Sequence, residues 1–385
     1  MDFCKRAGNF LWVPALTWLG STAVVCLAAR SLALPLSAPS TWMRWDSLAF
    51  MSIASNGYQF AANSQFFHGH VFPWRGNTQS FPLYPYIVRW ISFSSADQPM
   101  TAMIAAGVFH LAALCVLWNG WLKRQARSRA LLLMWLAAVF PGMIYCHAVS
   151  SVSLFVFLSL LILYLMMREK FAWACLFGSL AGATHAAGLF FVPALGFWVF
   201  AKRKHWPGRL LKAWGACASP LAGALAVLVT QHAQTGRWDS AVRLLAYHRF
   251  IPGWSWMRLQ QTLYLPPLYG QTALTLPAVF LQSSLVAVIC LLAFLRFAQS
   301  DTAPAAARSR FNREGQPLIL AFILVFWIAP HFSGYWHSFY RNETFLLPAL
   351  TLLDRVLPIV LMLLALVLTV TAYVMAQQFF LSILV

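Results

Sequence analysis

Acidic residues are scarce in this sequence. It holds nine Asp and Glu against 27 Lys and Arg among 385 residues, and only 9% of the chain is charged. A soluble domain carries roughly 25% charged residues, whereas 61% of this chain is hydrophobic and 16% is aromatic. The composition excludes an ordinary soluble domain and predicts a polytopic membrane protein.

Signatures of metal and disulfide chemistry are also missing. The seven cysteines are scattered and none forms a Cys-x-x-Cys pair, so we read them as small core residues. His68 and His70 are a close pair in a predicted external loop, but without a third ligand they favour a loop feature over a metal site. We therefore expect no metal and no cofactor.

Long apolar runs predict the transmembrane segments. A spanning helix needs roughly 20 mostly apolar residues, and fewer where it is buried. The fold class that we expect is an all-α polytopic membrane domain over residues 1–385. The sequence predicts eleven spans, at residues 10–36, 100–122, 130–146, 152–167, 171–184, 186–201, 213–231, 271–296, 316–331, 344–353 and 356–380.

Two of these spans are short neighbours. Residues 171–184 and 186–201 lie between two basic clusters, so the chain has to go out and come back between them. This predicts two short helices that meet near Thr184 and His185.

The distribution of Lys and Arg predicts the orientation. Three strongly basic loops, within residues 123–129, 202–212 and 296–313, fall on the same side as the N-terminus, which we assign to the cytoplasm. The net charge of +18 is mostly this topology signal and not a nucleic-acid footprint, although basic loops also favour anionic lipid. The opposite, external loops are then 37–99, 147–151, 232–270 and 332–343.

Every basic residue in the external loops is an arginine. The arginine side chain presents a planar fork that suits phosphate and carboxylate. Anchoring at the membrane interface is the alternative, although lysine would do that equally well. These residues are Arg44, Arg75, Arg89, Arg237, Arg243, Arg249, Arg258 and Arg341.

Only four acidic residues face outward in this arrangement: Asp46, Asp97, Asp239 and Glu343. Asp97 precedes an apolar helix with a proline at its start, which is typical of an N-cap. A general base on the external face must therefore be Asp46, Asp239, Glu343 or a histidine.

Asp46 lies in the stretch Trp45-Asp46-Ser47, directly before apolar residues at helical spacing. Residues 45, 49, 50, 53 and 54 share one helical face, which predicts an amphipathic helix at the interface. A carboxylate at that depth needs compensation, and Arg44 and the helix start are close enough to supply it. The alternative is that Asp46 only caps the helix.

The stretch "WDSLAFMSIASNGY", followed by "SFPLYPYIVR", resembles the first external loop of the PIG-V-type mannosyltransferases, whose pattern is W-D-x-x-x-[YF]-x-x-I-A-x-x-G-Y and then F-P-L-Y-P. Weaker similarities are "FPGMIY", "ATHAAG", "TGRWDSAVRLLAYHR" and "HSFYRNETFLLPAL". Three positions depart from the pattern. Val152 replaces a glutamate, His185 replaces an arginine, and Arg341-Asn342 matches the late Arg-Tyr only loosely.

The resemblance implies a GT-C glycosyltransferase that acts on polyprenyl- or dolichyl-phosphate sugars with inversion. It places Asp46 as the general base, and an Arg or His beside the leaving phosphate. The expected partners are a polyprenyl-phosphate-sugar donor, a lipid, glycan or protein acceptor, membrane lipids, and no nucleic acid. Candidate donor-phosphate or substrate-binding residues are Arg44, Arg75, His185, Asp239, Arg243, Arg249, Arg341 and Glu343, and candidate pocket residues are Trp45, Tyr58, His68, His70, Trp74 and Tyr84.

His185 lies where two short helices meet at membrane depth. Two roles are open for it: a core residue whose hydrogen bonds are satisfied, or a contact to the donor phosphate.

The loop 59–85 is long and shows no obvious helix of its own. Such loops are usually functional or disordered, and its aromatic residues argue against disorder. We expect it to form a lid or wall over the Asp46 pocket. The alternative is that it only packs against the other long external loop, 232–270.

The function that we expect is transfer of a hexose, with mannose as the expected sugar, on the extracytoplasmic face of a bacterial inner membrane. A lipid-linked saccharide flippase or another non-catalytic transporter is the alternative. A transporter of that kind would show internal repeats, and we find none in the sequence.

Overall fold

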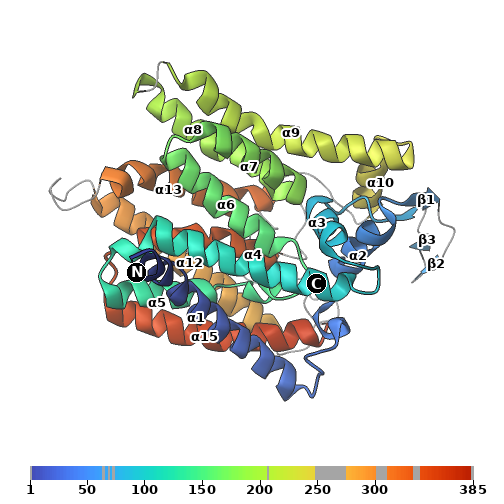
Figure 1. Cartoon of the computed structure of the whole chain (residues 1–385), viewed down its shortest axis with the longest axis horizontal. Coiled ribbons are helices and arrows are strands. Elements are labelled where there is room, and N and C mark those ends of the chain that lie inside the picture. Colours follow the sequence, from blue (N-terminus) through green and yellow to red (C-terminus); the bar gives the residue numbers. More distant parts are fainter. Residues whose placement is uncertain are drawn as a thin grey trace.

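The structure is a computed structural model that describes residues 2–62, 66–67, 70–71, 74–205, 208–247, 275–300, 310–332 and 339–382. Helices make up most of these residues (Figure 1). Two residues of the predicted site, His68 and Arg249, lie outside the described residues, as do residues 248–270 of the second long loop.

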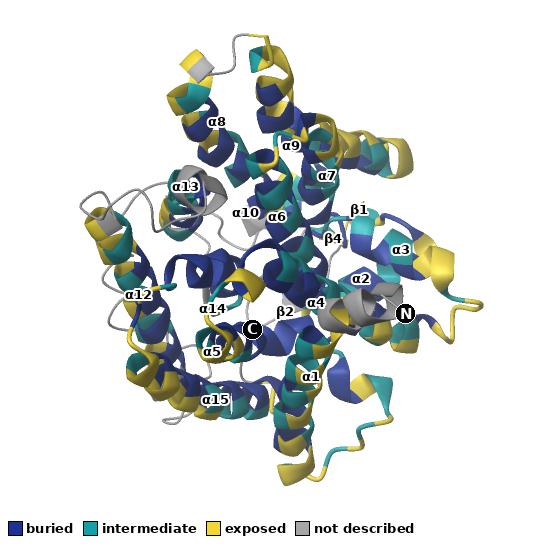
Figure 2. Cartoon of the chain, turned by 60° about the vertical axis from the view of Figure 1, so that its left-hand side comes forward, coloured by how far each residue is buried: buried dark blue, intermediate teal, exposed yellow. Residues whose placement is uncertain are grey.

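Among the residues that the structure describes, five helices are long and apolar enough to cross a membrane. The five helices are α1 (Asp2–Ser31), α4 (Gln98–Gly120), α9 (Leu210–Thr235), α12 (Thr275–Ser300) and α15 (Pro358–Phe380). Large apolar side chains are exposed on them, such as Trp12, Leu225 and Leu366. Exposed residues, coloured yellow, lie along the outer sides of α9 and α12 in Figure 2. An apolar outer surface on such helices is what lipid requires, so the chain is an integral membrane protein.

The predicted count of eleven spans is not confirmed. In the described part of the chain the other apolar helices are short, except α13 (Arg310–Phe332), whose apolar stretch covers only Gly315–Ala329. The segment predicted at 130–146 is divided. A turn separates its two pieces because Pro141 has no N–H and Gly142 adopts a left-handed φ of 78°. The shorter elements are α5 (Arg127–Ala138), η3 (Met143–Cys146), α6 (Val152–Met167), α7 (Phe171–Thr184), α8 (Phe191–Lys202) and η7 (Glu343–Leu352).

The two short helices do meet at Thr184 and His185, as the sequence predicts. Helix α7 ends at Thr184, and His185 takes an extended conformation with φ −156° and ψ 145°. The chain then continues through the 3-10 turn η4 (Ala186–Phe190) into α8.

The element η7 lies inside the bundle. It is a 3-10 helix of 10 residues, and all of them are buried, mainly against α12, α13 and α6. A 3-10 helix rises about 2 Å per residue, so this one is about 20 Å long and too short to cross a bilayer alone. Its Phe345 packs edge-on against Phe155 of α6, with the ring centroids 4.5 Å apart. The predicted span at 344–353 is therefore a buried core element.

Helices α7 and α9 pack more extensively than any other described pair. Glycines allow the approach. A Cβ on Gly182 would lie 2.1 Å from the carbonyl oxygen of Pro220, and one on Gly223 would lie 1.9 Å from that of Ser179. Small residues at a helix crossing are typical of membrane proteins, because they let two backbones pack closely.

The elements of the first predicted external loop and α10 (Ser240–Tyr247) of the second lie together at one end of the bundle, on the right in Figure 1. The N-terminus, the end of α8 and the start of α9 lie at the opposite end. The basic residues 202–204 are therefore at the same end as the N-terminus, as the charge pattern predicts. The external elements are α2 (Asp46–Asn56), β1 (Phe60–Ala62), β2 (Phe66–Phe67), β3 (His70–Val71), β4 (Trp74–Gly76), α3 (Leu83–Ile91) and α10 (Ser240–Tyr247).

The loop 59–85 is more structured than its sequence indicates. Strand β1 pairs antiparallel with β4, with Ala61 opposite Arg75, and β2 pairs with β3. The stretch Phe81–Pro85 leads into helix α3, which begins at Leu83. Strands this short give almost no periodic signal, so the sequence reading missed them. The remaining described elements are η1 (Pro39–Trp42), η2 (Leu122–Arg124), η5 (Arg203–His205) and α14 (Phe339–Asn342).

The α7–α9 crossing generates a stability prediction. Gly182→Ala should lower the free energy of unfolding by about 1–3 kcal/mol, because the added methyl group meets backbone that cannot move aside. Gly215→Ala, on the same helix pair, is the control, since a Cβ there meets nothing within 4 Å. Thermal unfolding in detergent measures both. Equal melting temperatures for the two variants would contradict the close packing.

Candidate functional site

Helix α2 begins at Asp46, after a tight turn. The Arg44 N–H donates to Ser47 Oγ at 3.0 Å, and Ser47 Oγ lies 2.8 Å from the carbonyl oxygens of Arg44 and Val149. Trp45 occupies the N-cap position, and its side chain makes no capping hydrogen bond. Asp46 therefore does not cap this helix, and its carboxylate is left for another partner.

The buried face of α2 agrees in part with the predicted amphipathic pattern. Phe50, Ile53 and Ala54 are buried, as expected. Trp45 is not part of that face, since 45% of it is exposed.

The partner of Asp46 is Arg341. The Arg341 guanidinium forms an ion pair with Asp46 Oδ2, across 295 residues of sequence. Arg341 comes from α14, directly before the buried η7, and its side chain is only 16% exposed, against 44% for that of Asp46. Its guanidinium also lies over the Tyr145 ring, 5.8 Å from the centroid. The sequence reading gave the compensating role to Arg44, and the structure gives it to Arg341.

Arg44 has a different set of partners. Its guanidinium donates to the carbonyl oxygens of Ser40 and Met43, both at 2.7 Å, and of Phe380 at 2.9 Å. Phe380 is the last residue of α15, where carbonyl groups lack partners and the helix dipole favours a cation. Burial lowers the pKa of the guanidinium. Arg44 thus joins the turn before Asp46 to the C-terminal end of α15.

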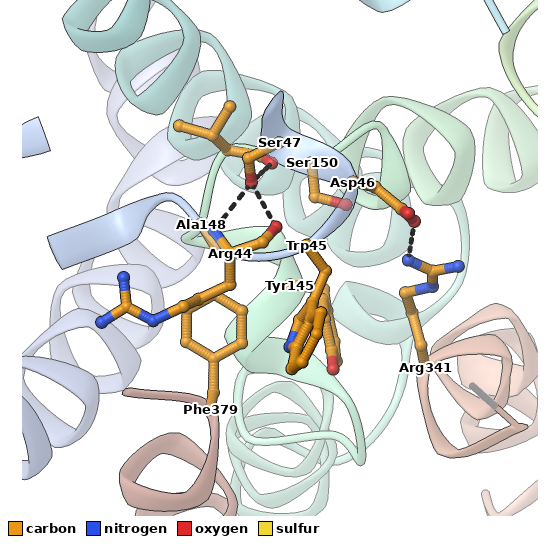
Figure 3. Close-up of a pocket in the computed structure, with 10 residues that line it drawn as sticks. Arg44, Trp45, Asp46, Ser47, Tyr145, Ala148, Ser150, Arg341 and Phe379 are labelled. Atoms are coloured by element: carbon orange, nitrogen blue, oxygen red, sulfur yellow. Dashed lines mark hydrogen bonds and ion pairs between the residues drawn. The ribbon is translucent and has the colours of Figure 1, made fainter. Parts of the chain in front are cut away.

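A small pocket opens beside the ion pair (Figure 3). It encloses about 260 Å³ of empty space, including its open mouth. Asp46 and Arg341 face each other on one side of the view, and the rings of Trp45 and Tyr145 overlap in it. The pocket is lined by Arg44, Trp45, Asp46, Ser47, Tyr145, Ala148, Val149, Ser150, Arg341 and Phe379.

Part of this lining was not predicted. Tyr145 lies in "FPGMIY", which resembles the PIG-V-type pattern. Ser150 lies where that pattern has Tyr-Ser-Glu. Both segments therefore stand out in the sequence, although neither residue is predicted to belong to the site. Ser47 and Phe379 gave no signal, because their contacts join distant parts of the chain.

His185 lies close to the ion pair but does not line the pocket. It is within electrostatic reach of both Arg341 and Asp46. Its Nδ1 accepts from the Ala187 N–H at 3.0 Å, which caps η4. Its ring packs edge-on against Phe345, with the centroids 5.1 Å apart. These contacts make His185 a packed residue behind the site.

Glu343 lies two residues after Arg341, but its buried side chain contacts α12 and does not line the pocket. Gln282 Nε2 of α12 donates to Glu343 Oε2 at 2.7 Å, and Gln282 Oε1 accepts from the Gly142 N–H at 3.3 Å. Thr344 Oγ1 donates to the carbonyl oxygen of Pro141 at 3.0 Å. Glu343 therefore helps to hold η7 against α12 and the turn at Pro141, outside the pocket lining.

Asp239 and Arg243 form a second cluster. Asp239 accepts from Arg237 at 2.9 and 3.1 Å and also from Arg243. The guanidinium carbons of Arg243 and Arg237 lie 5.0 and 5.8 Å from the Trp74 ring centroid, and Trp74 stacks on Phe60. Hydrogen bonds from the two arginines hold the pKa of the Asp239 carboxyl well below its usual range. The sequence reading grouped Asp239 and Arg243 with Asp46, but neither lines the Asp46 pocket.

The second cluster also bears on the predicted lid. Strand β4, which carries Trp74 and the exposed Arg75, packs against α10 of the 232–270 loop. Neither residue lines the Asp46 pocket. The described contacts of β4 thus match the alternative, in which the 59–85 loop packs on the other long loop. The backbone of His70 lies in β3.

Tyr58 and Tyr84 lie in the core and not around the pocket. Tyr58 donates from its hydroxyl to the Ser80 carbonyl at 2.8 Å, and Tyr84 donates to the Ala102 carbonyl at 2.7 Å. Both are buried. Their phenol rings supply apolar packing, and their hydroxyls satisfy backbone groups.

No group of three His, Cys, Asp or Glu side chains placed to hold a metal ion occurs among the described residues.

The ion pair generates a prediction of energetic coupling. A double-mutant cycle with Asp46→Ala and Arg341→Ala should give a coupling energy of about 1 kcal/mol in the free energy of unfolding. The exposed pair Glu169–Arg209 is the control, and it should give less because solvent screens it more fully. Strictly additive effects at Asp46 and Arg341 would contradict the pairing.

No protein-family model and no curated protein matches the sequence. Solved structures do match. The crystal structure of the apo Archaeoglobus fulgidus oligosaccharyltransferase aligns with a TM-score of 0.54 and 11% identity, over 96% of this chain and 55% of that chain. The Archaeoglobus fulgidus oligosaccharyltransferase tethered through a disulfide bond to an acceptor peptide with the NVT sequon gives a TM-score of 0.50 and 13% identity, with the same coverage.

This chain thus spans about half the length of the oligosaccharyltransferase chains that it matches. At such low identity the likeness shows the fold alone. The shared fold extends over nearly the whole of this chain.

Proposed function

We propose that this chain is an inverting membrane glycosyltransferase that transfers a hexose from a polyprenyl-phosphate-linked donor to an acceptor hydroxyl. The observation that carries the proposal is the meeting of Asp46 and Arg341 at an open pocket in a GT-C fold. A carboxylate and a guanidinium are the two groups that such a transfer needs, one for the attacking hydroxyl and one for the leaving phosphate. The resemblance of the Asp46 stretch to PIG-V-type enzymes makes mannose the first sugar to test.

In the proposed step, the acceptor oxygen forms a bond to the anomeric carbon while the bond from that carbon to the phosphate oxygen breaks. The hydroxyl proton passes to the Asp46 carboxylate. The lipid phosphate leaves with the bonding electron pair, and Arg341 stabilises the charge that develops on it. Asp46 is suited to its part because it is half-exposed at the pocket and not buried in the core.

The ion pair gives the proposed reaction an order. As long as Arg341 binds Asp46, the carboxylate shares its charge with the guanidinium and is a weaker base. A donor phosphate competes for the same guanidinium, and the planar fork of arginine suits phosphate. Donor binding then frees Asp46 to accept a proton from the acceptor.

We further propose that the pocket end of the bundle faces the periplasm of a bacterium and that the chain lies in the inner membrane. The gathering of basic residues 202–204 at the end opposite α2 supports the orientation. The acceptor is a lipid, a glycan or a protein.

A transfer assay tests the proposal. Purified protein is given polyprenyl-phosphate mannose, or the glucose or arabinose analogue, each labelled in the sugar, together with a membrane extract as the acceptor source. We expect label to leave the lipid donor and enter the acceptor fraction, fastest with mannose. Retention of all label on the lipid with every donor would overturn the proposal.

Removal of the proposed base should abolish most turnover. Asp46→Asn keeps the shape of the side chain but cannot accept the proton, and the expected loss of kcat is about 10²–10⁴-fold. Asp97→Asn is the control, because Asp97 is an exposed external residue that bonds to Ser94 away from the pocket. Near-normal turnover by a folded Asp46→Asn variant would remove Asp46 from the chemistry.

Matched substitutions can distinguish the role of Arg341 from that of Arg243. Arg341→Lys replaces a fork by a point charge, so KM for the donor should rise about tenfold. Arg243→Lys is the control, since Arg243 belongs to the cluster with Asp239 and Trp74. An equal effect of the two substitutions would show that external arginines act together as interface anchors.

A further inference from the structure

Trp45 has an unusual backbone conformation. Its φ is 48° and its ψ is −106°, outside the regions that residues with a Cβ favour. Such strain persists only where the surrounding structure imposes it, and it is found mostly at functional sites.

The bonds that impose the conformation lie on both sides of Trp45. Arg44 and Ser47 bond to each other across it, N–H to Oγ at 3.0 Å and Oγ to carbonyl oxygen at 2.8 Å. Ser47 Oγ is also fixed to Val149, and the Arg44 guanidinium is fixed to the end of α15 at Phe380. The residue between these two anchors has little freedom.

Burial of the indole does not explain the strain. Trp45 is 45% exposed, while apolar residues of the same helix, such as Phe50 and Ile53, are buried. The indole lines the pocket together with Tyr145, and in the view of Figure 3 it lies between Arg44 on one side and the Asp46–Arg341 pair on the other. The strained turn therefore holds a broad aromatic surface open to ligand beside the two groups of the proposed chemistry.

We propose that the Trp45 indole is the platform on which the pyranose ring of the donor sugar stacks. The inference rests on the proposed function and names the part of the site that holds the sugar. The anomeric carbon has to lie between a hydroxyl held by Asp46 and a phosphate held by Arg341, so the rest of the ring lies along the adjacent wall. Trp45 precedes Asp46 directly and forms that wall, and an indole offers a rigid apolar face to the C–H groups of a sugar.

An interface anchor is the competing role, because exposed tryptophans often lie at the level of lipid head groups. An anchor needs only an exposed indole. It does not need the residue to be clamped at an unfavourable φ beside a carboxylate, whereas a stacking platform has to be held at one position.

The test compares two ligands in direct binding to the purified full chain: polyprenyl-phosphate mannose, and polyprenyl phosphate without a sugar. Trp45→Gly should weaken binding of the sugar-bearing lipid about tenfold and leave binding of the bare lipid phosphate unchanged. Trp45→Phe should keep most of the binding. Glycine adopts positive φ readily, so Trp45→Gly should melt no lower than the wild type.

Trp45→Ala is the matched control for strain. It also lacks the indole but keeps a Cβ, so it should lose the same sugar-dependent binding and melt below Trp45→Gly. Equal weakening of both ligands in Trp45→Gly, or weakening of neither, would overturn the platform. Failure of the wild type to bind either lipid would instead overturn the proposed function itself, and the platform with it.

Discussion

The ion pair between Asp46 and Arg341 is the contact on which the external end of this structure depends. It joins the first external loop to a residue that lies 295 positions later, next to the fully buried η7. Two ions are costly to remove from water unless they pair, so the pair fixes where α2 starts and where η7 enters the bundle. The same two groups are the only ones of the pocket lining that form a direct ion pair among the described contacts.

The structure around this pair is rigid on one side and open on the other. Arg44 ties the turn to α15, and Ser47 ties it to the segment before α6. The resulting framework holds Asp46 at a defined point while leaving it half-exposed. This is the arrangement that a general base needs, since it has to stay in position and still meet a substrate. The cluster of Asp239 and Arg243 performs a separate task, the joining of α10 to β4.

Local patterns in the sequence predicted the features that depend on local chemistry. The helix after Asp46 and the break at His185 follow from apolar spacing and short segment length, and both are present. The sequence predicts that Arg44 and the helix start compensate Asp46, because proximity in sequence is the only guide, whereas the ion-pair partner comes from the far end of the chain. The count of eleven spans is not confirmed, because apolar runs identify buried 3-10 elements such as η7 as readily as lipid-facing helices.

A structure with polyprenyl-phosphate mannose bound tests the central claim most directly. The account predicts that the lipid phosphate lies within hydrogen-bond distance of the Arg341 guanidinium, that Asp46 has separated from Arg341, and that the carboxylate faces the anomeric carbon. Lipid phosphate bound elsewhere on the chain, with the Asp46–Arg341 pair intact, would contradict it.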